Sequence, residues 1–270
     1  MPKVLRILAL FCLVGLLFGC VTFLKPALST ASSAPGELTV AAAADLQYAF
    51  TEIGALFEQE TGTKVTFVFG STGQLAQQIE NGAPFDLFAA ANITFVNDLT
   101  EKDLVLPDSV ALYARGRIVL AVNRASGVSA ISLADLLSDQ ITHIAIANPE
   151  HAPYGVAARE ALQSAGIWEQ VQPKIVYSEN VRQALQYIQT GDAQAGIVAL
   201  SVANVPEITW TLIDDSLHNP LDQALAVVAS STHPELARQF AAFINSPSGR
   251  PIMQKVGFIL PGEPVAAPTP

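Results

Sequence analysis

The chain has 270 residues, of which 50% are hydrophobic and 14% are charged, and its formal net charge is −10. A chain of this length and composition can bury a sizeable core, which excludes a disordered or fibrous protein. Its 14 basic residues stand against 24 acidic ones, so no basic stripe is available and nucleic-acid binding is not expected.

The first twenty residues have the pattern of a secretory signal peptide. Lys3 and Arg6 precede an apolar run over 7–18, which is too short to span a membrane comfortably. The run leads into the letters LFGC, which resemble the lipobox of bacterial lipoproteins, whose cysteine is lipidated before cleavage. We therefore predict a signal peptide over 1–19 and lipidation of Cys20. The alternative is an ordinary secreted protein with an incidental cysteine.

The segment 20–36 is rich in serine, alanine and proline and shows no apolar periodicity. This composition predicts a linker between the lipid anchor and the folded body. At the other end, residues 263–270 are predicted to be a disordered tail. The two cysteines, Cys12 and Cys20, both precede the body, so no disulfide framework or cysteine-based zinc site is expected there.

From residue 38 onward, short apolar strands alternate with amphipathic helices. The expected strands are 38–40, 64–69, 85–88, 117–123, 144–147, 175–177, 195–199 and 225–229. The expected helices are 46–57, 75–79, a short helix opened by a capping box at 132–135, and 154–165, 181–189 and 236–244. This alternation is typical of βαβ units on a mostly parallel sheet.

About 225 residues of such alternation exceed the needs of one doubly wound unit, which predicts two lobes with a ligand cleft between them. We predict an α/β fold in which each lobe is a mostly parallel sheet flanked by helices. Lobe one is expected to comprise 37–116 and 227–262, and lobe two 117–226. The hinge is expected in the strands near Arg117 and Leu225.

Motifs of enzymes and metal sites are absent from the sequence. No P-loop occurs, and the GSTG stretch at 70–73 is one residue too tight for a nucleophile elbow. The histidines, which are His143, His151, His218 and His233, have no metal-ligand spacing. A secreted enzyme would have to take its general base from Asp45, Glu150, His151 or Glu179. We expect no catalytic residue, no cofactor and no metal ion held directly by side chains.

The positive signal lies in four turns that each end a strand and open a helix. They are AAAADL at 41–46, GSTG at 70–73, NPEHAPYG at 148–155 and SENV at 178–181. Helix starts carry unpaired N–H groups and the positive end of the helix dipole, which favour an anion. Ligands of open α/β sheets bind beyond the carboxyl ends of the strands, so such turns can face one another across a cleft. The alternative is that they are only well-capped turns.

The same segments resemble those of periplasmic molybdate-binding proteins, the capture subunits of molybdate ABC transporters. The similar stretches are 39–46, 69–79, 81–88, 148–155, 159–162, 179–185, 196–198 and 255–258, which together span roughly 38–260. The resemblance implies a two-lobed binding protein that closes around a tetrahedral dianion. It further implies a site outside the cytoplasmic membrane and delivery of molybdate or tungstate to an ABC transporter permease.

By the same resemblance, the ligand oxygens are expected to be held by six residues: Ala44, Asp45, Ser71, Thr72, Tyr154 and the backbone of Val181. Many family members carry a tyrosine after the 196–198 strand, where this chain has Ala199, and we expect Tyr154 to supply the phenol instead. Asp45 stands just before Leu46, which favours a side chain that caps its own helix over one that faces the ligand.

We therefore expect a monomeric, lipid-anchored receptor rather than an enzyme, with a membrane permease as partner and no nucleic acid. A receptor for sulfate or phosphate is the first alternative. A secreted enzyme on the same scaffold and an adhesion or structural lipoprotein are more remote ones.

Overall fold

The computed structural model describes residues 36–264, and this part of the chain forms one compact unit. The predicted signal peptide, Cys20, nearly all of the predicted linker and the last six residues lie outside the described residues. Among the helices of 36–264, none combines the length and the apolar character needed to cross a membrane.

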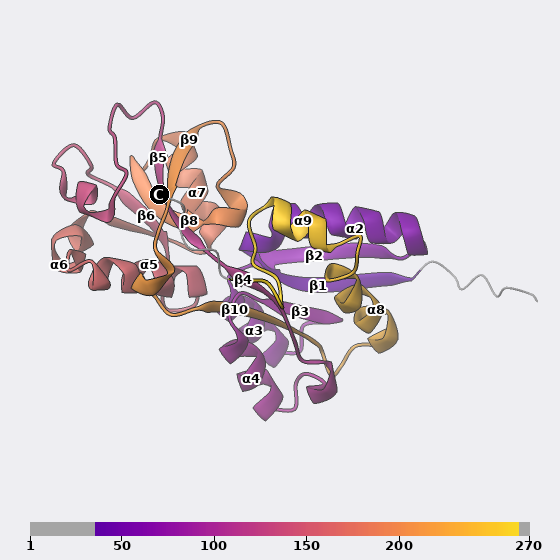
Figure 1. Ribbon diagram of the computed structural model, residues 1–270. Helices are drawn as coiled ribbons and strands as arrows, with labels where there is room; N and C mark the ends of the chain where they lie inside the picture. The colour runs from indigo at the N-terminus through magenta and orange to yellow at the C-terminus, as the bar shows by residue number, and fades with distance from the viewer. Residues whose placement is uncertain (1–35, 265–270) are drawn as a thin grey trace, which may run out of the picture. The chain divides into compact units, whose positions relative to one another are not determined.

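The first of two five-stranded sheets has the strand order β2-β1-β3-β10-β4 (Figure 1). Its strands are β1 (Glu37–Ala43), β2 (Lys64–Gly70), β3 (Leu87–Ala90), β4 (Ala111–Gly116) and β10 (Leu221–Val227). Strand β1 pairs in parallel with β2 and β3, whereas β10 is antiparallel to both β3 and β4. Four of the five strands therefore run in one direction.

Helices cover both faces of this sheet. Successive side chains of a strand point to opposite faces, and here both sets are apolar and buried against helices. Val40 and Ala42 pack into the same core cluster as α2 and α8, while Ala41 between them packs with α3 and α4. The helices are α2 (Gln47–Thr61), α3 (Thr72–Glu80), α4 (Ile93–Glu101), α8 (Pro234–Ile244) and α9 (Arg250–Lys255), with short 3₁₀ turns η1 (Ala44–Leu46) and η2 (Pro107–Ser109).

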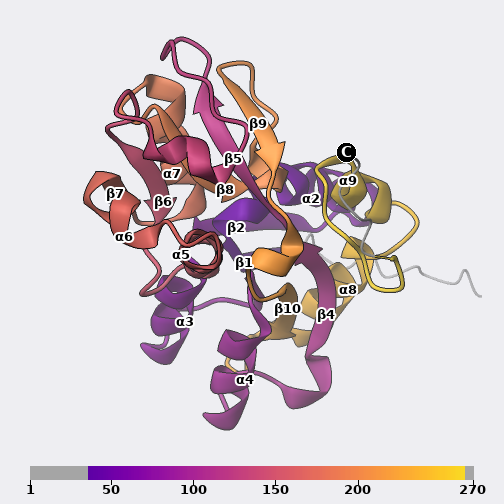
Figure 2. The same ribbon diagram turned by 60° about the vertical axis from the view of Figure 1, so that its left-hand side comes forward.

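The second sheet has the order β7-β6-β8-β5-β9 (Figure 2). Its strands are β5 (Ile118–Asn123), β6 (Ile144–Ala147), β7 (Ile175–Ser178), β8 (Ala195–Ala199) and β9 (Ile208–Leu212). Its helices are α5 (Pro153–Ser164), α6 (Trp168–Val171) and α7 (Val181–Thr190), with 3₁₀ turns η3 (Leu133–Leu137), η4 (Gln172–Lys174), η5 (Leu200–Val202) and η6 (Asp215–Leu217). Only β5 opposes the other strands, being antiparallel to β8 and β9.

The chain passes between the sheets twice, from β4 to β5 at Arg117 and from β9 to β10. Each sheet has one antiparallel strand, and it is the first strand after a crossing: β5 in the second sheet and β10 in the first. The other strands follow the predicted mostly parallel pattern. The predicted change of lobe at residue 226 falls inside β10, all of which pairs in the first sheet. The predicted elements do not include α4, α6, α9, β4 or β9.

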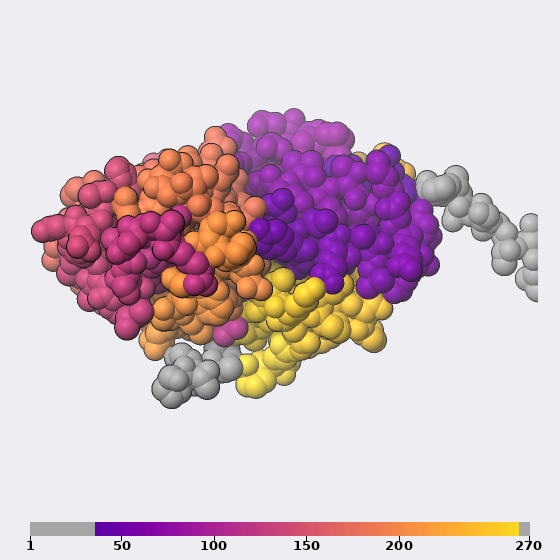
Figure 3. All heavy atoms as spheres, turned by 90° about the horizontal axis from the view of Figure 1, so that it is seen from above, coloured from indigo at the N-terminus to yellow at the C-terminus, as the bar shows by residue number. Residues whose placement is uncertain are grey.

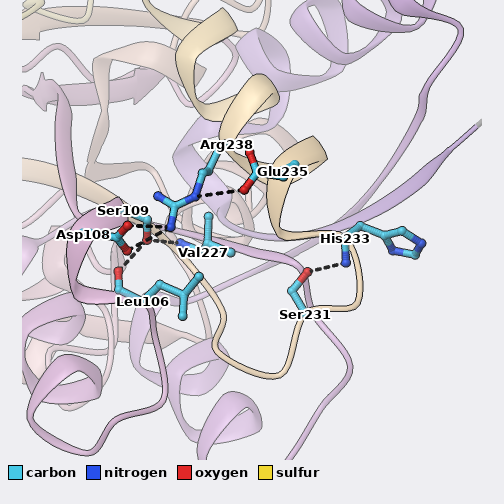
Figure 4. A network of polar contacts seen from close by, with 8 residues as sticks. All are labelled: Leu106, Asp108, Ser109, Val227, Ser231, His233, Glu235 and Arg238. Atoms are coloured by element: carbon cyan, nitrogen blue, oxygen red, sulfur yellow. Dashed lines mark hydrogen bonds and ion pairs between the residues drawn. The ribbon is translucent and has the colours of Figure 1, made fainter.

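Polar contacts hold the far end of β10 in place (Figure 4). The Ser109 hydroxyl accepts a hydrogen bond from Val227 N–H at 2.9 Å and donates one to the Leu106 carbonyl at 2.6 Å. The Arg238 guanidinium on α8 reaches both carboxylate oxygens of Asp108 at 2.9 Å. These contacts join η2, α8 and the returning strand.

The C-terminal segment packs beside α2, as Figure 3 shows from above. Lys255 Nζ on α9 lies 3.1 Å from a carboxylate oxygen of Glu52. Glu263, the first residue of the predicted tail, accepts hydrogen bonds from Arg250 and from Leu260 N–H, both at 2.9 Å. Residues 265–270 of that tail are not among those described.

Candidate functional site

A small pocket lies where strands of both sheets end and the following helices begin. Turn η1 follows β1, α3 follows β2, α5 follows β6 and α7 follows β7, all at carboxyl ends. The pocket is lined by Ala43, Ala44, Asp45, Gly70, Ser71, Thr72, Ala91, Ala152, Pro153, Tyr154, Asn180 and Val181. All six residues predicted to bind a ligand are thus brought together, and Ala199 is not among the lining residues.

The pocket has the scale of a small ion. Its cavity volume is about 10 Å³, far below the roughly 300–1,000 Å³ of pockets for drug-sized ligands. By the same measure, a crevice of about 520 Å³ lies elsewhere, beside Tyr48 and Trp210. That crevice does not include the starts of α3, α5 or α7.

Backbone N–H groups at the helix starts are available to the pocket. On α7 the Asn180 side chain accepts hydrogen bonds from the N–H groups of Arg182 and Gln183, which leaves that of Val181. Helix α5 begins with Pro153, which has no N–H, so the first donor of that helix is Tyr154. Since these groups have no partner within their own helix, an anion can accept from them.

Two hydroxyl groups at the start of α3 line the same pocket. Thr72 is buried, and its Oγ1 accepts a hydrogen bond from Ala91 N–H at 3.0 Å, so its own hydrogen can be donated into the pocket. Ser71 begins the helix without a side-chain cap. Its Oγ lies 2.9 Å from Nδ1 of His151, which stands before α5.

The two halves of the pocket also meet through backbone. Gly73 N–H on α3 donates to the His151 carbonyl at 2.9 Å. A Cβ at Gly73 would lie 2.8 Å from that oxygen, so only glycine allows this approach without a shift. Together with the Ser71–His151 contact, this bond joins the turn after β2 to the turn after β6.

A buried polar cluster forms one wall and joins both sheets. The Tyr154 hydroxyl on α5 donates to Oδ2 of Asp45 at 2.9 Å, and Gln223 Nε2 on β10 donates to the same oxygen at 2.7 Å. Gln223 Oε1 in turn accepts from the Tyr113 hydroxyl on β4 at 2.8 Å. Gly116 makes room for the cluster, because a Cβ there would collide with the Tyr154 hydroxyl.

The prediction that the Asp45 side chain caps its helix is wrong. Neither η1 nor α2 has a side-chain cap hydrogen bond. The 3₁₀ turn begins at Ala44, so Asp45 lies inside it rather than at its cap. Its carboxylate turns instead to the donors of Tyr154 and Gln223. The predicted phenol contact of Tyr154 with a ligand stays a prediction, since this hydroxyl donates to Asp45.

Burial dominates the electrostatics of this wall. It raises the pKa of Asp45 from 3.8 to about 6, against the opposing effect of hydrogen bonds from Gln223, Tyr154 and its own N–H. No lysine, arginine or histidine within residues 36–264 forms an ion pair with Asp45. The pKa values of Tyr113 and Tyr154 lie well above 10, first because of burial and then because of the charge of Asp45.

Sequence reasoning missed Gln223 and Tyr113, which complete the cluster around Asp45. Gln223 carries a signal that the sequence shows, because it is the one polar residue of the otherwise apolar stretch 223–227. In the structure its side chain is fully buried. The described residues contain no group of three or more histidine, cysteine, aspartate or glutamate side chains placed to hold a metal ion.

Comparison with known proteins adds the family context. Residues 38–259 match the family model described as bacterial extracellular solute-binding protein. The chain is 33% identical over 229 residues to the molybdate-binding protein ModA of Rhodobacter capsulatus, covering 84% of this chain and 90% of that protein. It is 32% identical over 235 residues to YvgL of Bacillus subtilis, provisionally named an ABC transporter substrate-binding lipoprotein, covering 85% and 89%.

Among solved structures, the Azotobacter vinelandii periplasmic molybdate-binding protein superposes with a TM-score of 0.77 at 28% identity. The match covers 83% of this chain and 99% of that one. It confirms the predicted α/β fold of two lobes, each built on one of the sheets described above.

Proposed function

This chain belongs to the bacterial extracellular solute-binding proteins, and we propose that it captures molybdate or tungstate outside the cytoplasmic membrane and delivers it to an ABC transporter permease. Relatives named for molybdate binding support this proposal. The observation that carries it is the small pocket on which the starts of η1, α3, α5 and α7 converge. Its donors are dipoles fixed in place, so a dianion needs no counter-cation.

Capture then proceeds by closure of the lobes on the anion. Donors come from the N–H groups of Ala44 or Asp45, Tyr154 and Val181 and from the hydroxyls of Ser71 and Thr72. Each hydrogen bond to a charged oxygen contributes about 1.5–3 kcal/mol net. Five to seven of them, less the costs of association and closure, give roughly −8 to −12 kcal/mol, a micromolar to nanomolar dissociation constant.

A phosphate receptor is the second candidate, and Asp45 is the observation that favours it. Phosphate carries a hydrogen near neutral pH and needs an acceptor in its site. An ionised Asp45 carboxylate in the pocket wall could provide one. Sulfate has neither that hydrogen nor the size of molybdate, so a pocket shaped for molybdate would hold it loosely.

Membership in a solute-binding family supports a receptor rather than an enzyme, and a location outside the cytoplasm. We further propose that Cys20 is lipidated and that the protein is a monomer. We also propose that the hinge lies where the chain crosses between the lobes, near Arg117 and just before β10. The name of the Bacillus relative agrees with a lipid anchor. Labelling of cells with an alkynyl fatty acid tests the anchor, since a Cys20→Ser variant should lose the label.

Calorimetry with molybdate, tungstate, sulfate and phosphate tests the proposed function. We expect tight binding of molybdate and tungstate and at least a hundredfold weaker binding of the other two, about 2.7 kcal/mol. Thr72→Val should weaken molybdate binding by about 1–3 kcal/mol through the lost donor. Thr100→Val is the matched control, because the Thr100 hydroxyl donates to the Val96 carbonyl within α4. A preference for phosphate, or no heat with any anion, contradicts the proposal.

A further inference from the structure

The two carboxylate oxygens of Asp45 have unequal surroundings. Oδ2 accepts from Tyr154 and Gln223, at 2.9 and 2.7 Å. Oδ1 is buried and, among the described residues, has no hydrogen-bond partner on another residue. The residue itself is 1% exposed and lines the anion pocket. A buried carboxylate oxygen without a donor is costly, so a group still to arrive is the natural partner of Oδ1.

The elements packed around Asp45 supply hydrogen-bond donors, and no basic side chain within residues 36–264 forms an ion pair with its carboxylate. Helix α7 packs against η1 and carries Arg182, whose guanidinium donates to Gln47 and Tyr48 instead. Helix α5 contributes Tyr154, β10 contributes Gln223, and β4 contributes Tyr113, which contacts Gln223. From η5 the Ser201 hydroxyl donates to the Asp45 carbonyl at 2.8 Å. His151, the other titratable side chain near the pocket, contacts Ser71. An ionised Asp45 is therefore uncompensated within residues 36–264.

A dianion in this pocket adds two negative charges beside that carboxylate. Like charges at short range favour the neutral form of a carboxyl group. The same burial that already raises the pKa of Asp45 to about 6 makes this repulsion strong, because solvent does not screen it. One proton from solvent removes the conflict.

We propose that Asp45 takes up one proton from solvent when the pocket captures its oxyanion, and that the resulting Oδ1–H donates a hydrogen bond to a ligand oxygen. The proposal rests on the proposed function. It makes Asp45 a specificity-determining residue, because a neutral carboxyl group offers its hydrogen to a fully deprotonated anion. Hydrogenphosphate brings its own hydrogen to an ionised Asp45 and needs no proton from solvent, so pH affects the binding of the two anions differently.

The proton count is measured by titrating the purified protein with molybdate at pH 7.5 in two buffers of different ionisation enthalpy. We expect uptake of about one proton per anion. Between pH 7 and 9, where molybdate stays a dianion, its affinity should fall about tenfold per pH unit. Over the same range its advantage over phosphate should shrink.

Asp45→Asn is the decisive variant, because its amide carbonyl can take the place of Oδ2 while its NH₂ donates without a proton from solvent. It should bind molybdate with no proton uptake and with an affinity that is flat in pH. His151→Asn should keep the uptake. Uptake that persists in Asp45→Asn, or that disappears in His151→Asn, overturns the assignment to Asp45.

The wild-type protein alone keeps the proposal testable if a variant fails to fold. Molybdate binding with no proton uptake and no pH dependence overturns the role of Asp45 and leaves the proposed function standing. Absence of molybdate binding at every pH contradicts the proposed function itself.

Discussion

Replacement of Gly73 by alanine should separate closure of the pocket from folding. The Gly73 N–H and the His151 carbonyl meet across the two lobes at 2.9 Å. An added Cβ would lie 2.8 Å from that oxygen and 3.1 Å from Cα of His151, whereas ordinary contact starts at 3.4 Å. The turns would have to separate by about 0.6 Å to admit the methyl group.

Overpacking of this kind costs about 1–3 kcal/mol, and here it falls on the closed state. Molybdate should then bind roughly 5- to 150-fold more weakly to Gly73→Ala. The unliganded fold gains helix propensity at this position, so its melting temperature should stay level or rise slightly. Titration calorimetry and scanning calorimetry without ligand measure the two effects separately.

A contrasting variant guards against a trivial result. Gly155→Ala would drive a Cβ into the Ala147 carbonyl within the second lobe, so it should lower the melting temperature of the unliganded protein. If Gly73→Ala bound molybdate as tightly as the wild type, the contact between Gly73 and His151 would not be part of lobe closure. A fall in melting temperature as large as that of Gly155→Ala would show that the clash acts on folding instead.

Three further outcomes follow from the same contacts. Tyr154→Phe removes a buried hydrogen-bond donor from Asp45. It should lower the free energy of unfolding, measured by urea titration, by about 1–3 kcal/mol. An unchanged free energy of unfolding would disprove the hydrogen bond. Because Asp45 has a folded pKa of about 6 against 3.8, the native state binds more protons between these values. The unliganded wild type should therefore lose about 2 kcal/mol of stability relative to Asp45→Asn as pH rises from 4 to 7, and parallel pH profiles would contradict this. Arg238→Ala breaks a surface ion pair with the 74% exposed Asp108 and should change stability by less than about 1 kcal/mol and molybdate affinity not at all.

The turns around the pocket were predictable because their signal is local. Small residues in 41–44, the glycines of 70–73 and Asn180 before α7 mark strand-to-helix transitions wherever they occur. Parallel topology then brings the carboxyl ends of β1 and β2, and those of β6 and β7, to one edge of each sheet. The residues that line the pocket come from the turns at those edges.

The cluster around Asp45 was not predictable in the same way. Gln223 reaches Asp45, and Tyr113 reaches Gln223, only because β10 returns to the first sheet between β3 and β4, and that pairing spans more than a hundred residues. The cap predicted for Asp45 failed by two positions, since η1 starts at Ala44 and its N-cap is Ala43. Strand β9 was missed because it lies at the edge of its sheet and carries exposed residues such as Trp210.

A crystal structure of the protein with molybdate, phased or located by the anomalous signal of molybdenum, tests most directly whether both lobes hold one anion. We expect a single anomalous peak in the pocket between Thr72 and Val181, with hydrogen bonds to the ligand oxygens from α3 and η1 on one side and from α5 and α7 on the other. A peak bound by one lobe only, or located in the crevice beside Trp210, would contradict the account.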